Sequence, residues 1–235
     1  MLAYELDLAL AKSLSEACRQ YPRVQIQATN FLAAVNLPSR YCVVSNIPFM
    51  STTAIVKQLT EDKRFEFGYF VMQEEAANRF GGQQLTAPSG ILSIQMQIRH
   101  KFSLLHHFSR ADFSPAPSVE TVLVKIERIQ NKVSLDQEQF FMNFVSYLFN
   151  QSHPVVRRAP ILGRYMARRI DLGRIQLMQK KPSDLTIEDF LYLFSLCTYE
   201  VLEKIAGYDE KLKSEGSSIQ KIYRTRNASN WKNMV

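Results

Sequence analysis

The tetrapeptide Asn46-Ile47-Pro48-Phe49 carries the residue types that could grip an unpaired nucleobase. Proline lacks an N–H donor and fixes one backbone dihedral, which leaves the neighbouring carbonyls facing outward as acceptors. The Asn46 amide oxygen and the carbonyl of Ile47 or Pro48 could accept both hydrogens of an exocyclic amine, while the Phe49 ring stacks on the base. The alternative is a turn at Asn46, a strand end at Pro48 and a core side chain at Phe49.

The flanking segments place this tetrapeptide where a strand ends and a helix begins. Residues 41–44 are aromatic and β-branched, which predicts a buried strand. Residues 54–59 have helical spacing, and Ser51 or Thr52 can serve as the N-cap. Ligands of open α/β sheets bind at the carboxyl ends of the strands, so this position suits a binding site. For an arbitrary tetrapeptide of this type the structural turn is nevertheless the commoner role.

A second segment, residues 113–119, reads Phe-Ser-Pro-Ala-Pro-Ser-Val. Two prolines favour an extended segment of low conformational entropy. Phe113 at its start could then close one wall of a base-sized pocket. Residues 122–126 follow with the alternation of a strand, so the alternative is a rigid linker into a β-hairpin.

Two polar residues follow predicted strands nearer the N-terminus. Glu5 comes at the end of a short strand within residues 1–6, and its carboxylate could accept from two ribose hydroxyls. The alternative role is an acid that complements a helix dipole, which fits Asp7 well. Asn30 follows a half-buried strand at residues 24–28 and also suits a turn.

Together these segments resemble the rRNA adenine dimethyltransferases, a family of small-subunit housekeeping enzymes and large-subunit enzymes that confer macrolide resistance. Residues 45–49, followed by Ser51 and Thr52, resemble the family's target-base motif, and residues 113–119 resemble its Phe-x-Pro-x-Pro-x-Val loop. Residues 73–76 resemble a Gln-Glu-x-Ala segment. The resemblance runs from about residue 4 to residue 194. It implies an α/β, Rossmann-like, S-adenosylmethionine-dependent methyltransferase sheet followed by a small all-helical domain.

The resemblance also implies the reaction and the residues that serve it. Methyl would pass from S-adenosylmethionine to N6 of a flipped-out rRNA adenine, once or twice. Asn46, Ile47, Pro48, Phe49 and Phe113 would hold the base, and no metal is expected. The donor would contact Glu5, Asn46 and Asn30, the last at a position where the family usually has an acid.

One family feature is missing at the front of the chain. Members have a first strand followed by a glycine-rich loop, whereas this chain has eight glycines and none before Gly68. The sequence therefore corresponds to a fragment or to a divergent protein. We expect exposed core surface in a sheet that lacks its central strand, and weak or no donor binding by this chain alone.

The C-terminal part of the chain consists of basic, acidic and basic segments in turn. Residues 151–182 hold eight Lys/Arg and one acid, residues 183–210 hold seven acids and one base, and residues 211–235 hold six bases and one acid. Such clustering predicts contact with RNA phosphates. The predicted RNA-binding residues are Arg157, Arg158, Arg164, Arg168, Arg169, Arg174, Lys180 and Lys181. The predicted domains are a methyltransferase domain at 1–130, a helical RNA-binding domain at 131–206, and a basic, disordered tail at 207–235.

Composition agrees with a cytoplasmic monomer whose partner is rRNA or a pre-ribosomal particle. The chain has 235 residues, a net charge of +7 and three widely spaced cysteines. No apolar run approaches the ~20 residues of a membrane span. The short loop at residues 83–90 and the compact helical lobe favour the resistance type. A non-catalytic RNA-binding protein, and a ribosome-assembly or mitochondrial transcription factor relative, remain alternatives.

Overall fold

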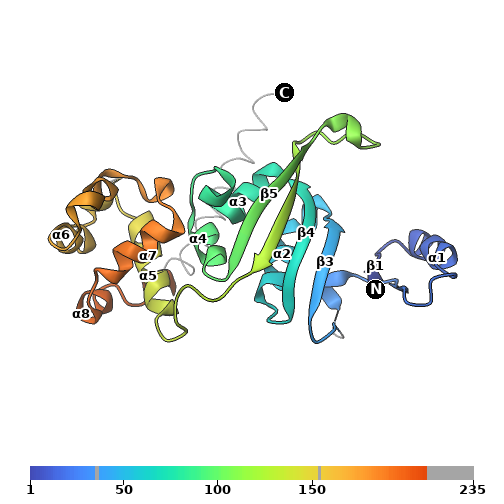
Figure 1. Cartoon of the computed structure of the whole chain (residues 1–235), viewed down its shortest axis with the longest axis horizontal. Helices are drawn as coiled ribbons and strands as arrows, with labels where there is room; N and C mark the ends of the chain where they lie inside the picture. Colours follow the sequence, from blue (N-terminus) through green and yellow to red (C-terminus); the bar gives the residue numbers. More distant parts are fainter. Residues whose placement is uncertain (35–36, 153–154, 211–235) are drawn as a thin grey trace, which may run out of the picture. The chain divides into compact units, whose positions relative to one another are not determined.

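The computed structural model describes residues 1–34, 37–152 and 155–210, which form two compact units (Figure 1). Unit 1 comprises residues 1–77 and 100–128, and unit 2 contains residues 78–99 and the described residues from 129 onward. The sequence-based division assigned residues 78–99 to the first domain, whereas their contacts group them with the helical unit. The assignment of a function to each domain stays a prediction. Most of the predicted tail, including Trp231, lies outside the described residues.

The larger sheet of unit 1 has four strands in the order β3-β4-β6-β5 (Figure 1). The strands are β3 (Tyr41–Asn46), β4 (Phe65–Gln73), β5 (His100–Phe108) and β6 (Thr121–Arg128). β3 is parallel to β4, and β6 is antiparallel to both β4 and β5. Helix α2 (Thr52–Glu61) contacts β4 and buries Val56 and Leu59. The strands and the helix predicted around the tetrapeptide are therefore confirmed.

One face of this sheet is core and the other is open. Gly68, Phe70 and Met72 of β4 pair with Ile126, Val124 and Val122 of β6, and all six residues are buried. The opposite side, which we call the open face, carries the alternate residues of each strand. On β3 these are Cys42, Val44 and Asn46, all of them exposed. Side chains alternate between the two faces of a sheet along each strand, which explains why Asn46 projects from the face opposite the core.

The first two strands form a separate parallel sheet. Strand β1 (Leu2–Tyr4) pairs with β2 (Gln25–Gln27), and helix α1 (Leu8–Ala17) connects them. Among the described strands, neither β1 nor β2 pairs with β3, so β3 has an unpaired edge. Val44 is 83% exposed, and α1 leaves Leu8 and Leu10 exposed. The expectation of exposed core surface in an incomplete sheet is confirmed.

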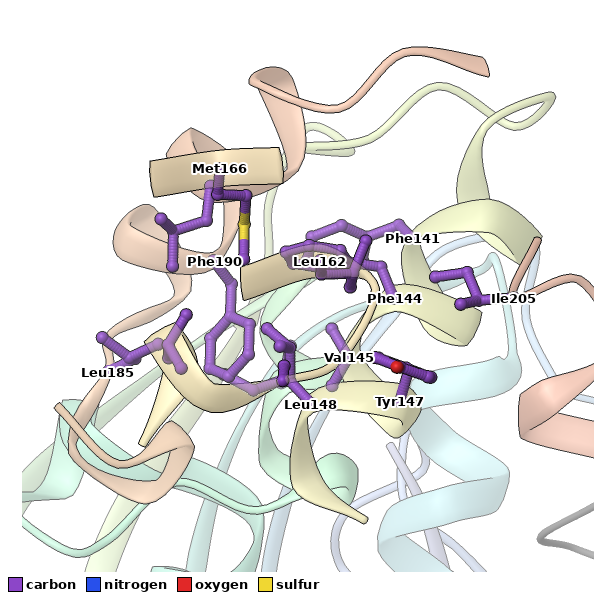
Figure 2. Packing of buried hydrophobic residues seen from close by; sticks show 14 of the residues in the cluster. Phe141, Phe144, Val145, Tyr147, Leu148, Leu162, Met166, Leu185, Phe190 and Ile205 are labelled. Carbon is purple, nitrogen blue, oxygen red and sulfur yellow. The ribbon is translucent and has the colours of Figure 1, made fainter. Parts of the chain in front are cut away.

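Unit 2 is helical around one apolar core. Its helices are α3 (Glu74–Gly81), which begins in unit 1, α4 (Ile91–Gln97), α5 (Glu138–Phe149), α6 (Leu162–Ala167), α7 (Ile187–Ser195) and α8 (Tyr199–Glu203). Phe144 and Leu148 of α5 and Phe190 of α7 are buried members of this core (Figure 2). Helix α5 turns an apolar face to this core, on which Phe141, Phe144, Val145 and Leu148 are buried. A capping box begins α7, because the Thr186 and Asp189 side chains each accept from the other's backbone N–H at 3.1 Å.

Candidate functional site

The end of β3 places Asn46 in a row that crosses the whole sheet. Asn46 pairs with Val71, Val71 with Leu123, and Leu123 with His106. Residues paired across neighbouring strands point to the same face, so this row lies on the open face. The Asn46 amide is exposed and makes no hydrogen bond within the described residues. Its polar atoms are therefore available to a ligand.

The next residue anchors the motif in the sheet. The Ile47 side chain is 1% exposed, and its backbone N–H donates to the Val71 carbonyl at 2.9 Å. This bond continues the β3–β4 ladder one residue past the strand. Within the tetrapeptide, Ile47 is the core residue, whereas Phe49 is 39% exposed in a 3-10 helix spanning Phe49–Ser51. The exposed ring suits stacking on a base better than the core role considered for Phe49.

The two candidate backbone acceptors differ in their existing bonds. The Pro48 carbonyl already accepts from the Ser51 N–H at 2.9 Å and from the Thr52 hydroxyl at 3.3 Å. These bonds use both of its lone pairs and join the motif to the start of α2. No hydrogen bond to the Ile47 carbonyl is present among the described residues. The Ile47 carbonyl is therefore the better partner for an amine held by Asn46.

The opposite end of β3 is also anchored. The Tyr41 hydroxyl donates to the Asp62 carboxylate at 2.9 Å, and the Arg64 guanidinium and backbone N–H donate to the same carboxylate. The hydrogen bonds from Arg64 lower the pKa of Asp62 to about 2. Asp62 is thus ionised at neutral pH and holds the start of the strand that ends at Asn46.

Phe113 lies in the loop at the same edge of the sheet. Strands β3 and β4 are parallel, so Gln73 at the end of β4 lies near the end of β3. Gln73 pairs with Thr121 of β6, and Thr121 pairs with Phe108 of β5. The β5–β6 turn therefore leaves the sheet at the edge where β3 ends, and Figure 1 shows it extending beyond the strands. Phe113 is half-buried, and its ring meets Phe108 edge-to-face at 5.4 Å. No hydrogen bond or ring contact joins Phe113 to the tetrapeptide among the described residues.

The residues expected to contact the donor lie together at the edge of the smaller sheet. Tyr4 and Gln27 are register partners, so Glu5 and Asn30 both follow the carboxyl ends of β1 and β2. A Glu5 carboxylate oxygen accepts from the Asp7 N–H at 2.9 Å, and the Asn30 amide oxygen accepts from the Leu32 N–H at 3.0 Å. Each side chain retains further capacity, but both bonds also fit the structural roles considered as alternatives. Their role in donor binding stays a prediction.

Asp7 has the structural role that its position suggested. Its carboxylate accepts from the backbone N–H groups of Ala9 and Leu10, at 2.8 and 3.0 Å. It is therefore the N-cap of α1.

We predict that the chain by itself binds S-adenosylmethionine or S-adenosylhomocysteine more weakly than the micromolar range. The physical reason is that, among the described strands, no backbone pairing joins the sheet bearing Glu5 and Asn30 to the sheet bearing Asn46. Calorimetric titration of the full chain with either ligand measures this affinity. A micromolar dissociation constant that is lost in Glu5→Gln would show that the donor site is complete.

The predicted basic residues are presented by short elements of unit 2. Arg157 and Arg158 lie in a 3-10 helix spanning Val156–Arg158, and α6 carries Arg164. Every one of the eight is exposed except Lys180, which lies 4.0 Å from the Asp189 carboxylate. The guanidiniums of Arg169 and Arg174 stack over tyrosine rings, at 3.7 and 4.3 Å from the ring centroids. Stacking holds these two charges in place while leaving them exposed.

Removing the charges of Arg157 and Arg158 together is predicted to weaken RNA binding about tenfold at physiological salt. The slope of log affinity against log salt should fall by about one for each lost phosphate contact. Fluorescence anisotropy with an rRNA fragment over a salt series measures both quantities. Lys63→Ala, at an exposed lysine of unit 1, is the matched control. An unchanged salt slope in the double variant would exclude this turn from the RNA contact.

Two features of the structure escaped the sequence-based interpretation. One is a β-bulge at Leu105, which shifts the β5–β6 register between Leu104 and His106. The other is the close packing of Gly163 against the backbone of Arg157. A mixed apolar and polar run at residues 104–107 was the only signal for the bulge. Nothing in the local sequence marks Gly163.

The described residues contain no group of three or more His, Cys, Asp or Glu side chains that could hold a metal ion. In the same residues, no helix has the length and apolar character needed to cross a membrane.

The mixed sheet with polar residues at its strand ends has an α/β, Rossmann-like architecture. Two solved structures share the fold. The 23S rRNA methyltransferase ErmE aligns with a TM-score of 0.74 at 23% identity, covering 83% of this chain and 80% of that one. A dimethyladenosine transferase from Plasmodium falciparum aligns with a TM-score of 0.59 at 16% identity, covering 82% and 79%. The fold class predicted from the sequence is confirmed.

The sequence defines the family. Residues 1–195 match the ribosomal RNA adenine dimethylase family, and the chain belongs to it. The ribosomal RNA small subunit methyltransferase A of Thermotoga neapolitana is 30% identical over 198 residues, which are 83% of this chain and 72% of that protein. The protein of the same name from Thermotoga maritima is 30% identical over 196 residues, 83% of this chain and 66% of that one. The predicted family is thus confirmed.

Proposed function

We propose that this chain methylates N6 of an unpaired adenine in rRNA, with S-adenosylmethionine as the methyl donor. The observation that carries the proposal is the exposed Asn46 amide at a strand end, beside a free Ile47 carbonyl and an exposed Phe49 ring. Family membership supplies the reaction class. The proposal adds the roles that particular residues of this chain have in that reaction.

In the proposed mechanism the chain positions the base and performs no proton abstraction. The Asn46 amide oxygen and the Ile47 carbonyl each accept one hydrogen of the adenine amine. Their geometry turns the nitrogen lone pair away from the ring and toward the donor, while Phe49 stacks on the base. S-adenosylmethionine would supply the methyl group, while Asn46 and the Ile47 carbonyl would hold the accepting amine, whose surplus N–H proton would leave to solvent.

The donor would supply an electrophilic methyl group, and the described residues fit one part of it. Glu5 retains a carboxylate oxygen for ribose hydroxyls, and Asn30 retains its amide N–H donors for an adenine ring. These contacts concern the adenosine end alone. They agree with the weak donor affinity predicted above.

We further propose small-subunit rRNA, in the cytoplasm, as the substrate. Both sequence relatives at 30% identity are named as small-subunit methyltransferases. The resistance-type interpretation instead resembles the structural neighbour named as a 23S rRNA enzyme, at 23% identity. Exposed arginines of unit 2 would contact the RNA phosphates in either case.

A second candidate function is a non-catalytic RNA-binding protein. The separation of β1 and β2 from β3 favours it, because the expected donor and base contacts then belong to separate sheets. Such a protein would need the basic residues and would not need Asn46.

The deciding experiment is transfer of labelled methyl to unmethylated small or large ribosomal subunits at millimolar donor concentration. Incorporation into small-subunit rRNA, as N6-methylated adenine by mass spectrometry, is the expected result. Label in large subunits alone would favour the resistance type. RNA binding without any incorporation would establish the second candidate.

A further inference from the structure

We propose that Phe108 and the β-bulge at Leu105 are a positioning device for Phe113, the ring expected to wall the target-base pocket. This inference rests on the proposed function for what Phe113 does. The contacts that hold Phe113 are features of the structure and can be tested separately.

The bulge decides which face of the sheet Phe108 occupies. From His100 to Leu104, β5 pairs with β6 in one register, and Leu104 opposes Val124 on the core face. Leu105 is then the extra residue, after which His106 opposes Leu123 and Phe108 opposes Thr121. If β5 were regular, with Leu105 taking the place opposite Leu123, period-two alternation would leave Phe108 on the same face as Leu104. The bulge therefore transfers Phe108 to the open face, which also carries Asn46.

An aromatic series then links β5 to the loop. The His106 ring meets the Phe108 ring edge-to-face at 4.9 Å, and Phe108 meets Phe113 edge-to-face at 5.4 Å. His106 and Phe108 are two residues apart, on the same side of the strand. The Phe108 ring therefore packs against one side of the Phe113 ring, and the His106 ring of the same strand supports Phe108.

The loop around Phe113 is closed at its base. Arg110 and Glu120 form an ion pair at 2.8 Å, and the Glu120 carbonyl accepts from the Glu74 N–H at 3.0 Å. A capping box between Ser109 and Asp112 begins the short 3-10 helix spanning Arg110–Asp112, which immediately precedes Phe113. These bonds direct the backbone, but no hydrogen bond orients an apolar ring. The contact with Phe108 is therefore what limits the rotation of the Phe113 side chain.

Distance makes Phe108 a positioning residue. β5 and β3 are three strand spacings apart, about 14 Å at the usual spacing of neighbouring strands. A base held by Asn46 at the end of β3 would not touch the Phe108 ring. Any effect of Phe108 on that base must act through the loop.

A single-tryptophan reporter tests the proposal in the full chain. Phe113→Trp with Trp231→Phe leaves one tryptophan, since Trp231 is the only natural one. Into this background we would place Phe108→Ala or Phe108→Leu, and separately a deletion of Leu105, which makes β5 regular and keeps Phe108 opposite Thr121. His107→Ala is the matched control, because His107 opposes Val122 on the core-face side of the same strand. Time-resolved anisotropy measures rotation of the ring. Quenching by an RNA hairpin with an unpaired loop adenine measures stacking and needs no donor.

We expect Phe108→Ala to increase the fast anisotropy amplitude about twofold and to weaken hairpin binding about fivefold. Deletion of Leu105 should leave both quantities near those of the parent, because Phe108 stays on the open face. Phe108→Leu should be intermediate, and it keeps the test valid if the alanine variant fails to fold by circular dichroism. Equal behaviour of Phe108→Ala, Phe108→Leu and His107→Ala would overturn the proposal. Absence of methyl transfer by the natural chain would instead refute the proposed function, while the rotation measurement would still decide the role of Phe108.

Discussion

Replacing Asn46 by alanine is expected to lower methyl incorporation into rRNA about 100-fold, a loss typical of removing one preorganised polar contact at a reacting group. The Asn46 amide is exposed and makes no hydrogen bond within the described chain, so the substitution removes no native contact. Alanine leaves the adenine amine with the Ile47 carbonyl as its single acceptor, and its lone pair is no longer aimed at the donor.

A second substitution separates acceptor chemistry from side-chain size. Asn46→Asp keeps acceptor oxygens at the same position and loses the N–H donors, so its loss should be smaller than that of alanine. Cys42→Ser is the matched control, because Cys42 is exposed on the same face of the same strand. Initial rates at millimolar donor, with unfolding monitored by circular dichroism, give the comparison. Equal rates for the alanine variant and the natural chain would remove Asn46 from the site.

The second large effect is expected at Gly163, where alanine should lower the free energy of unfolding by about 2–3 kcal/mol. A Cβ at this position would lie 2.2 Å from the carbonyl oxygen of Arg157 and 2.9 Å from that of Val156. Both are backbone atoms, so the turn bearing Arg157 and Arg158 must move away from α6. This cost exceeds the 0.5–1 kcal/mol that alanine usually gains over glycine within a helix.

Gly173→Ala is the matched control for this substitution. Gly173 lies in the 3-10 helix spanning Leu172–Gln179 of the same unit, and a Cβ there meets no atom within 4 Å. Urea unfolding compares the stabilities, and RNA anisotropy reports whether the displaced arginines still bind. If the two alanine variants were equally stable, the close packing of α6 on the arginine turn would be refuted.

The exposed edge of β3 affects both experiments. An unpaired strand edge with apolar neighbours, such as Val44 at 83% exposure, can pair with another chain. The variants should therefore be compared at several protein concentrations. Loss of activity through association would change with concentration, whereas loss of a side-chain contact would not.

Sequence by itself determined the features that depend on neighbouring residues. The strand before Asn46, the helix after Ser51, and the capping box of Thr186 and Asp189 are local, because alternation, helical periodicity and cap chemistry act over a few positions. The two proline-bearing motifs, in their order along the chain, were enough to indicate the family that the comparison shows.

Tertiary structure decided the features that depend on pairing between distant segments. Strand register placed Asn46 and Phe108 on one face, which requires that Leu105 bulges out of the β5–β6 pairing. The Pro48 carbonyl accepts two hydrogen bonds from Ser51 and Thr52 at the start of α2, whereas the Ile47 carbonyl accepts none among the described residues. Separation of β1 and β2 from β3 likewise follows from which backbone edges meet. Such pairings join segments far apart in the chain, so no local pattern records them.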